Sequence, residues 1–416
     1  MTGAPTLARR LSLLDAVAIG LGSMIGAGVF AVFSPAAASA GGWLLVGLVI
    51  AALVAFCNAT SSAQLAAQYP TSGGTYVYGR ERLGPWPGFL AGWCFVIGKI
   101  ASCAAMAMTF AHYVAPEGWA TPIAIAAVVA LAAINYTGVT RTATATTVIV
   151  VVVLAVLAVV LVLGFSGPAA AEPALVSGTP HLYGILQSAG LLFFAFAGYA
   201  RIATLGEEVV EPRRTIPRAI VTSLAVVLVL YAALAAMLLL RLGPDALAAS
   251  SAPLLDAVAE AWWAAPVVRL GAAFAALGAL LALIAGIGRT SLAMARENDL
   301  PRWLSAVHPR FRTPHRAEVV VAVVIVAVIA VADLRGAIGF SSFGVLLYYF
   351  VANVSAFTQT AEHRRYPRAL QTFGALACLA LVATLPWRSV LVGLVVLAVG
   401  VAVRVALTAG RATPRA

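Results

Sequence analysis

The fold of this chain is decided by residues 22–30, which read Gly-Ser-Met-Ile-Gly-Ala-Gly-Val-Phe inside an apolar segment from about residue 13 to residue 38. Three glycines within seven residues predict an interrupted membrane helix, because glycine is a poor helix former. An unwound turn at membrane depth leaves backbone groups that hydrocarbon cannot pair, so it must be buried in protein or face a wet cavity. The alternative is that Gly22 and Gly26 only permit close helix packing.

A second apolar segment carries a similar interruption at residues 193–199, which read Phe-Phe-Ala-Phe-Ala-Gly-Tyr. Interrupted helices at corresponding positions of two halves indicate a transporter built on inverted repeats. We therefore expect the two interruptions to lie close together midway through the membrane.

The composition is that of an integral membrane protein. Of 416 residues, 62% are hydrophobic and 10% are charged, and the mean hydropathy is +1.00. No soluble domain of this size has such values. The four cysteines lie in apolar stretches without metal-site or disulfide spacing, so we expect buried core residues and neither a metal nor a cofactor.

Twelve apolar segments are long enough to span a bilayer. They cover approximately residues 13–38, 42–68, 87–113, 120–136, 143–165, 182–205, 218–241, 266–294, 317–332, 337–360, 369–385 and 387–409.

The basic residues fix the expected orientation. With the N-terminus inside, twenty arginines fall in inner connections and tails, and three fall in outer ones. This asymmetry is typical of a multi-pass protein of the cytoplasmic membrane with both termini in the cytoplasm. It accounts for most of the net charge of +11, so nucleic acid is not an expected partner.

The connections between spans are short, and they leave no room for a soluble domain. Motifs of ATP hydrolysis, serine hydrolases and zinc proteases are not found in the sequence. We expect a transporter and not an enzyme.

The interruptions predict a binding site for a zwitterion. The start of one half-helix presents free N–H groups to a carboxylate, and the end of another presents carbonyls to an ammonium group. An α-amino acid carries both charges. The candidate substrate-binding residues are Ser23, Met24, Ile25, Gly26, Ala27, Gly28, Phe194, Ala195, Phe196, Ala197 and Gly198. For the phenylalanines the alternative is plain core or lipid-facing packing.

Lys99 is the only lysine in the chain and lies near the middle of the third span. A charge there costs at least about 2.5–3.5 kcal/mol, so the side chain should face the bundle interior. No carboxylate occurs at comparable depth. If transport is coupled to protons, Lys99 is the best intramembrane carrier, and the alternative is a fixed cation bound to backbone carbonyls.

Two further features bear on coupling. Arg201 follows the second interruption closely, and it is expected to pair with a substrate carboxylate or with Glu207, Glu208 or a carbonyl. Residues 271–286 of the eighth span contain no Ser, Thr, Asn or acid, which disfavours a sodium site made of hydroxyls there.

Four segments in order resemble motifs of the amino acid–polyamine–organocation (APC) permease superfamily. Residues 22–30 resemble G-S-x-I-G-x-G-[IV]-F, residues 69–76 resemble P-x-x-G-G-x-Y, residues 193–198 with 207–218 resemble F-F-A-[FY]-x-G followed by E-E-x-x-x-P-x-[RK]-x-[IV]-P, and residues 295–301 with Thr313-Pro314 resemble A-R-D-G-x-x-P followed by T-P.

The resemblance covers nearly the whole chain and implies an all-α, LeuT-like fold of five-plus-five inverted repeats with helices one and six broken. Repeat one would span about residues 13–165, repeat two about 182–360, and two additional helices about 369–409, all in one domain. It also implies that Ser23, Ile25, Gly26 and Gly28 meet the substrate carboxylate. Phe194 would be the aromatic outer gate, and Ala195 and Ala197 would offer carbonyls to the amino group.

The sequence differs from the superfamily pattern at two positions, and both differences bear on the expected class of substrate. Many relatives carry a lysine in helix five, where this chain has about Val153, and some cationic exchangers carry an acid where it has about Ala200. We expect a secondary active transporter for a neutral amino acid, with proton coupling through Lys99 as a hypothesis. The alternatives are an exchanger or exporter of cationic amino acids or polyamines, and an amino acid sensor that does not transport.

Overall fold

The structure is a computed structural model that describes residues 11–69, 73–138, 143–170, 175–176, 178–203, 205 and 208–412. Its described residues are almost entirely helical, apart from an isolated bridge between Leu11 and Val209. The all-α prediction is confirmed. The helices are α1 (Leu13–Met24), α2 (Ala27–Ala31), α3 (Phe33–Ala40), α4 (Leu44–Gln68), α5 (Gly74–Leu83), α6 (Pro85–Val114), α7 (Ala120–Tyr136), α8 (Ala143–Ser166), α9 (Leu182–Phe196), α10 (Ala200–Ala203), α11 (Pro212–Ala249), α12 (Pro253–Asp256), α13 (Ala264–Arg296), α14 (His315–Val331), α15 (Leu334–Phe357), α16 (Arg368–Thr384) and α17 (Trp387–Ala412).

Each of the twelve predicted spans falls on a helix or a broken helix. Nine helical stretches in the described part of the chain are long and apolar enough to cross a membrane. Helices α7, α14 and α16, of 17 residues each, occupy the remaining predicted spans. Helix α11 extends past the end of its predicted span because a kink at Gly243 (φ 76°, ψ 166°) joins it to a short further helical stretch.

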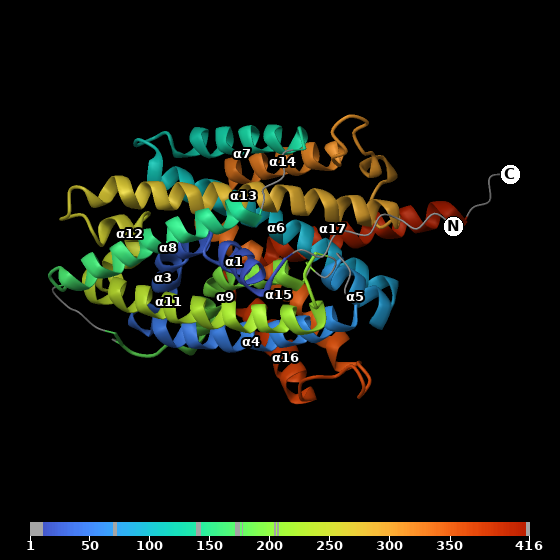
Figure 1. The fold of residues 1–416 in the computed structure, drawn as a ribbon, viewed down its shortest axis with the longest axis horizontal. Helices are drawn as coiled ribbons and strands as arrows, with labels where there is room; N and C mark the ends of the chain where they lie inside the picture. The colour runs from blue at the N-terminus through green and yellow to red at the C-terminus, as the bar shows by residue number, and fades with distance from the viewer. Residues whose placement is uncertain are drawn as a thin grey trace.

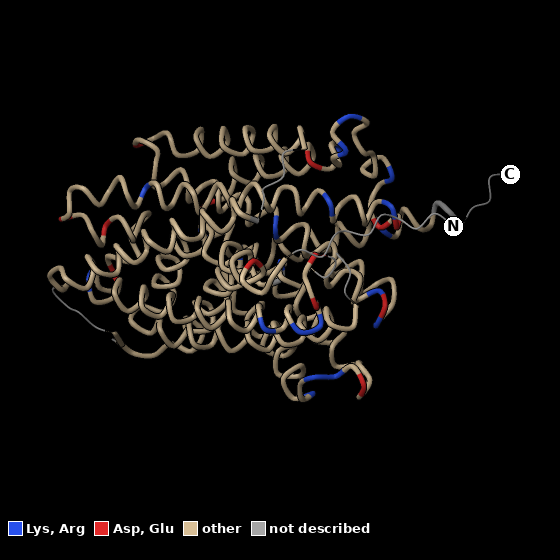
Figure 2. The backbone as a smooth tube through the Cα atoms, viewed as in Figure 1, with Lys and Arg blue, Asp and Glu red and all other residues tan. Residues whose placement is uncertain are grey.

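The long helices run side by side along the longest axis, with α1 and α9 near the centre of the bundle (Figure 1). Lysine and arginine gather toward the right-hand end in this view, where α5 and the end of α17 lie (Figure 2). This distribution is the one expected from the count of basic residues. That this end faces the cytoplasm stays a prediction.

A buried ion-pair cluster joins three segments at this charged end. The Asp299 carboxylate, which is 3% exposed, accepts hydrogen bonds from Tyr76 Oη at 2.8 Å and from Arg80 at 2.8 Å. It also forms an ion pair of 3.2 Å with Arg404 of α17. Burial, followed by the hydrogen bond to Asp299, raises the pKa of Tyr76. The last helix is thereby tied to α5 and to the loop after α13.

A second polar cluster lies at the opposite end. Arg335, at the start of α15, donates to Ser39 Oγ of α3 at 2.9 Å and to Gln187 Oε1 of α9 at 3.1 Å. Ser39 Oγ itself lies 3.2 Å from Gln187 Oε1. This second polar cluster connects α3 and α9 to α15.

Candidate functional site

The first broken helix changes direction at Gly26. Helix α1 ends at Met24, Ile25 remains in the helical region, and Gly26 takes φ −45° and ψ −143°, which no helix contains. Helix α2 then starts at Ala27. Helices α2 and α3 continue one another, since Val32 between them keeps helical angles. Pro35, which has no N–H, removes one bond of the helical ladder at that junction.

The second broken helix ends at Phe196 and continues as a 3₁₀ turn over residues Ala197–Tyr199 before α10 begins. Ala197 has φ −66° and ψ 0°, so the last α-helical hydrogen bonds give way to the tighter turn. Both interruptions therefore fall within the glycine-bearing stretches.

The two interruptions are in direct contact. A Cβ at Gly198 would overlap the main-chain carbonyl of Ser23 and the amide nitrogen of Met24. A Cβ at Gly28 would come within 2.9 Å of Cα of Ala195. The glycines are thus needed where main chain touches main chain, and the start of α2 lies beside the end of α9.

This contact gathers main-chain dipoles of opposite sign. The amides of Ala27 and Gly28 begin a half-helix and can serve a carboxylate, whereas Met24 and Ala195 lie at helix ends whose carbonyls can serve an ammonium group. The hydroxyl of Ser23 donates to Ile19 O at 2.8 Å, so its proton is already engaged in a hydrogen bond within α1. The arrangement suits a zwitterion, and binding itself stays a prediction.

Two tyrosines that the sequence analysis did not select contact the carbonyls of this region. Tyr231 Oη of α11 lies 2.6 Å from Met24 O and 3.3 Å from Ala195 O. Tyr349 Oη of α15 donates to Ala197 O at 3.2 Å. The only sequence signal for either residue is a hydroxyl within an apolar span.

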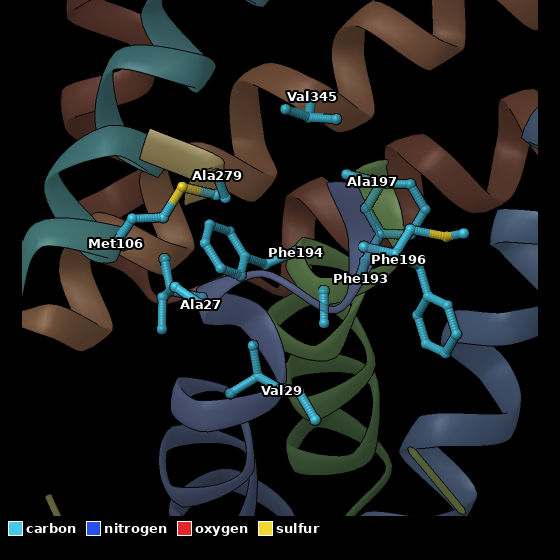
Figure 3. Packing of buried hydrophobic residues seen from close by; sticks show 14 of the residues in the cluster. Ala27, Val29, Met106, Phe193, Phe194, Phe196, Ala197, Ala279 and Val345 are labelled. Carbon is cyan, nitrogen blue, oxygen red and sulfur yellow. The ribbon is translucent and has the colours of Figure 1, made fainter. Parts of the chain in front are cut away.

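The three phenylalanines of α9 point in different directions. The ring of Phe194 extends toward Met106, Ala279 and Ala27, at the side of the interruptions that faces α6 and α13 (Figure 3). The ring of Phe196 instead lies edge-on to Tyr231, with 5.2 Å between centroids. Phe196 thus packs against α11, and the role of Phe194 as an aromatic gate stays a prediction.

Lys99 lies midway along α6 and is 7% exposed, so it faces the bundle interior as expected. Met106, seven residues further, shares its helix face and lies beside Ala279 of α13 (Figure 3). A Cβ built on Gly92, seven residues before, would lie 2.8 Å from Met294 Sδ of α13. Lys99 therefore faces α13, and within the described ranges it has neither a hydrogen bond nor an ion pair.

Arg201 is exposed on α10, below the second interruption. Glu208 and Arg289 are among the charged groups that act on it electrostatically. Glu208 was one of its expected partners, while Glu207 lies outside the described residues.

A cavity of about 10 Å³ lies against the first interruption, between α1, α8 and α13. Its lining includes Val153, and all its side chains are apolar. The lining residues are Gly22, Ile25, Gly26, Ile149, Val150, Val153 and Ala275.

The chain is similar to known amino acid permeases and transporters. The profile of the family described as "Amino acid permease" matches residues 11–412. Uncharacterized transporters of Mycobacterium tuberculosis and Mycobacterium bovis are 58% identical over 400 residues, which is 95% of this chain and 90% of theirs. The branched-chain amino acid permease BcaP of Bacillus subtilis is 25% identical over 97% of this chain and 93% of its own length.

Another relative has a different named substrate. Cationic amino acid transporter 7, chloroplastic, of Arabidopsis thaliana is 28% identical over 84% of this chain and 65% of its own length. The family consists of transporters and not of enzymes. In the described part of this chain, several helices are long and apolar enough to cross a membrane. The chain therefore belongs to the amino acid permease family.

Proposed function

We propose that this protein is a secondary active transporter that moves a neutral amino acid across the cytoplasmic membrane by alternating access within a LeuT-like fold. The observation that carries the proposal is the contact between the two interruptions, at Gly198 and at Gly28. It places free amides and helix-end carbonyls together, as recognition of a zwitterion requires. Phe194 extends toward Ala27, Met106 and Ala279, which are apolar, and this supports a neutral side chain.

Under the same proposal, Lys99 carries the coupling proton. It is buried and faces α13, and no carboxylate in the described part of the chain neutralises it.

A thermal-shift screen of the purified protein against the twenty amino acids and common amines tests the proposal. A ligand at a hundred times its Kd stabilises the folded state by about 2.7 kcal/mol, which raises the melting temperature measurably. We expect neutral amino acids to stabilise the protein and then to accumulate in proteoliposomes. Stabilisation by cationic amines alone would favour the exchanger, and binding without uptake would favour a sensor.

A further inference from the structure

Tyr231 connects both broken helices from a third helix. Its side chain is fully buried, and its hydroxyl lies 2.6 Å from Met24 O and 3.3 Å from Ala195 O. The ring is held edge-on by Phe33, at 6.2 Å between centroids, and by Phe196, at 5.2 Å. The position of the hydroxyl is therefore fixed by packing.

The hydrogen bonding of this hydroxyl is incomplete. A tyrosine hydroxyl has one proton to donate and lone pairs that accept. The short contact to Met24 O takes the proton, which leaves the Tyr231 oxygen and Ala195 O as two acceptors 3.3 Å apart. Among the described residues, no donor to the Tyr231 oxygen is found.

The hydroxyl of Tyr113, in the same protein, both donates and accepts a hydrogen bond. Its buried hydroxyl donates to Phe30 O at 3.0 Å and accepts from the amide of Leu254 at 3.4 Å. Buried polar groups normally have at least one hydrogen-bond partner. Tyr231 meets this condition, but unlike Tyr113 it has no donor to its oxygen among the described residues.

We propose that the missing donor is the ammonium group of the substrate. Tyr231 donates to Met24 O and accepts one N–H of the ammonium, while Ala195 O accepts another. Both carbonyls lie at negative helix ends, where a cation is favoured. The inference rests on the proposed function and adds to it a recognition residue on α11, outside both broken helices.

The test separates recognition of the ammonium from general stability. The probes are the twenty amino acids and, for the tightest binder, the carboxylic acid that lacks its amino group. In the Tyr231→Phe protein we expect affinity for the amino acid to fall tenfold or more, as loss of a hydrogen bond to a charged group implies. Affinity for the acid without the amino group should stay unchanged. Tyr113→Phe is the matched control and should leave the ratio of the two affinities at the wild-type value.

An equal loss for both ligands, or no loss for the amino acid, would overturn the inference and leave the proposed function standing. If the wild-type protein binds no amino acid, the proposed function fails and the inference fails with it. If Tyr231→Phe does not fold, 3,5-difluorotyrosine at this position keeps the shape and weakens the acceptor oxygen. The affinity ratio must then shift in the same direction.

Discussion

Replacing Gly198 with alanine should separate the two interruptions. The added methyl group would overlap main-chain atoms of Ser23 and Met24, which cannot rotate away as a side chain can. The 3₁₀ turn or the end of α1 must therefore move. Overpacking of this kind costs about 1–3 kcal/mol. A displacement of about 1 Å also disrupts hydrogen bonds, whose heavy-atom distances are confined to about 2.7–3.2 Å.

The assay pairs uptake of a neutral amino acid into proteoliposomes with the melting temperature in detergent. For Gly198→Ala we expect uptake to fall to about a tenth or less, since each 1.4 kcal/mol is a factor of ten, and the melting temperature to drop. The matched control is Gly286→Ala in α13, where a Cβ meets no heavy atom within 4 Å, so both readouts should stay at wild-type values. Wild-type uptake by Gly198→Ala would refute the reasoning.

Three other substitutions test separate parts of the structure. Lys99→Ala should abolish uptake driven by a pH gradient, and unchanged activity with an unchanged pH profile would rule out Lys99 as the proton carrier. Asp299→Asn should destabilise the protein by about 3–5 kcal/mol, because it leaves buried arginine charge uncompensated. Glu297 also pairs with Arg80, but its side chain is 55% exposed. Glu297→Gln should therefore cost at most about 1 kcal/mol in the same thermal melt. Arg335→Ala should raise deuterium uptake in α3 and α9 relative to α17, and equal exchange in all three helices would contradict the role of the second polar cluster.

The interruptions could be predicted from the sequence because they depend on local chemistry. Glycine-rich stretches inside apolar segments place both of them to within a few residues, and hydropathy places the twelve spans. The partners of Tyr231 could not be predicted, because Met24 lies 207 residues away and the contact exists only once α1, α9 and α11 pack together. The charged helix α5 also escaped a search for apolar segments.

The buried cluster at Asp299 has a consequence for how the bundle can move. Arg404 stacks over the rings of Trp86 and Phe89 at 4.5 and 4.7 Å and is ion-paired with Asp299. Helix α17 is thus attached through Arg404 to the start of α6 and to the loop after α13. If the loop after α13 moves during a transport cycle, α17 must move with it. Otherwise the ion pair with Asp299 breaks or the Arg404 guanidinium loses its contact with the two rings.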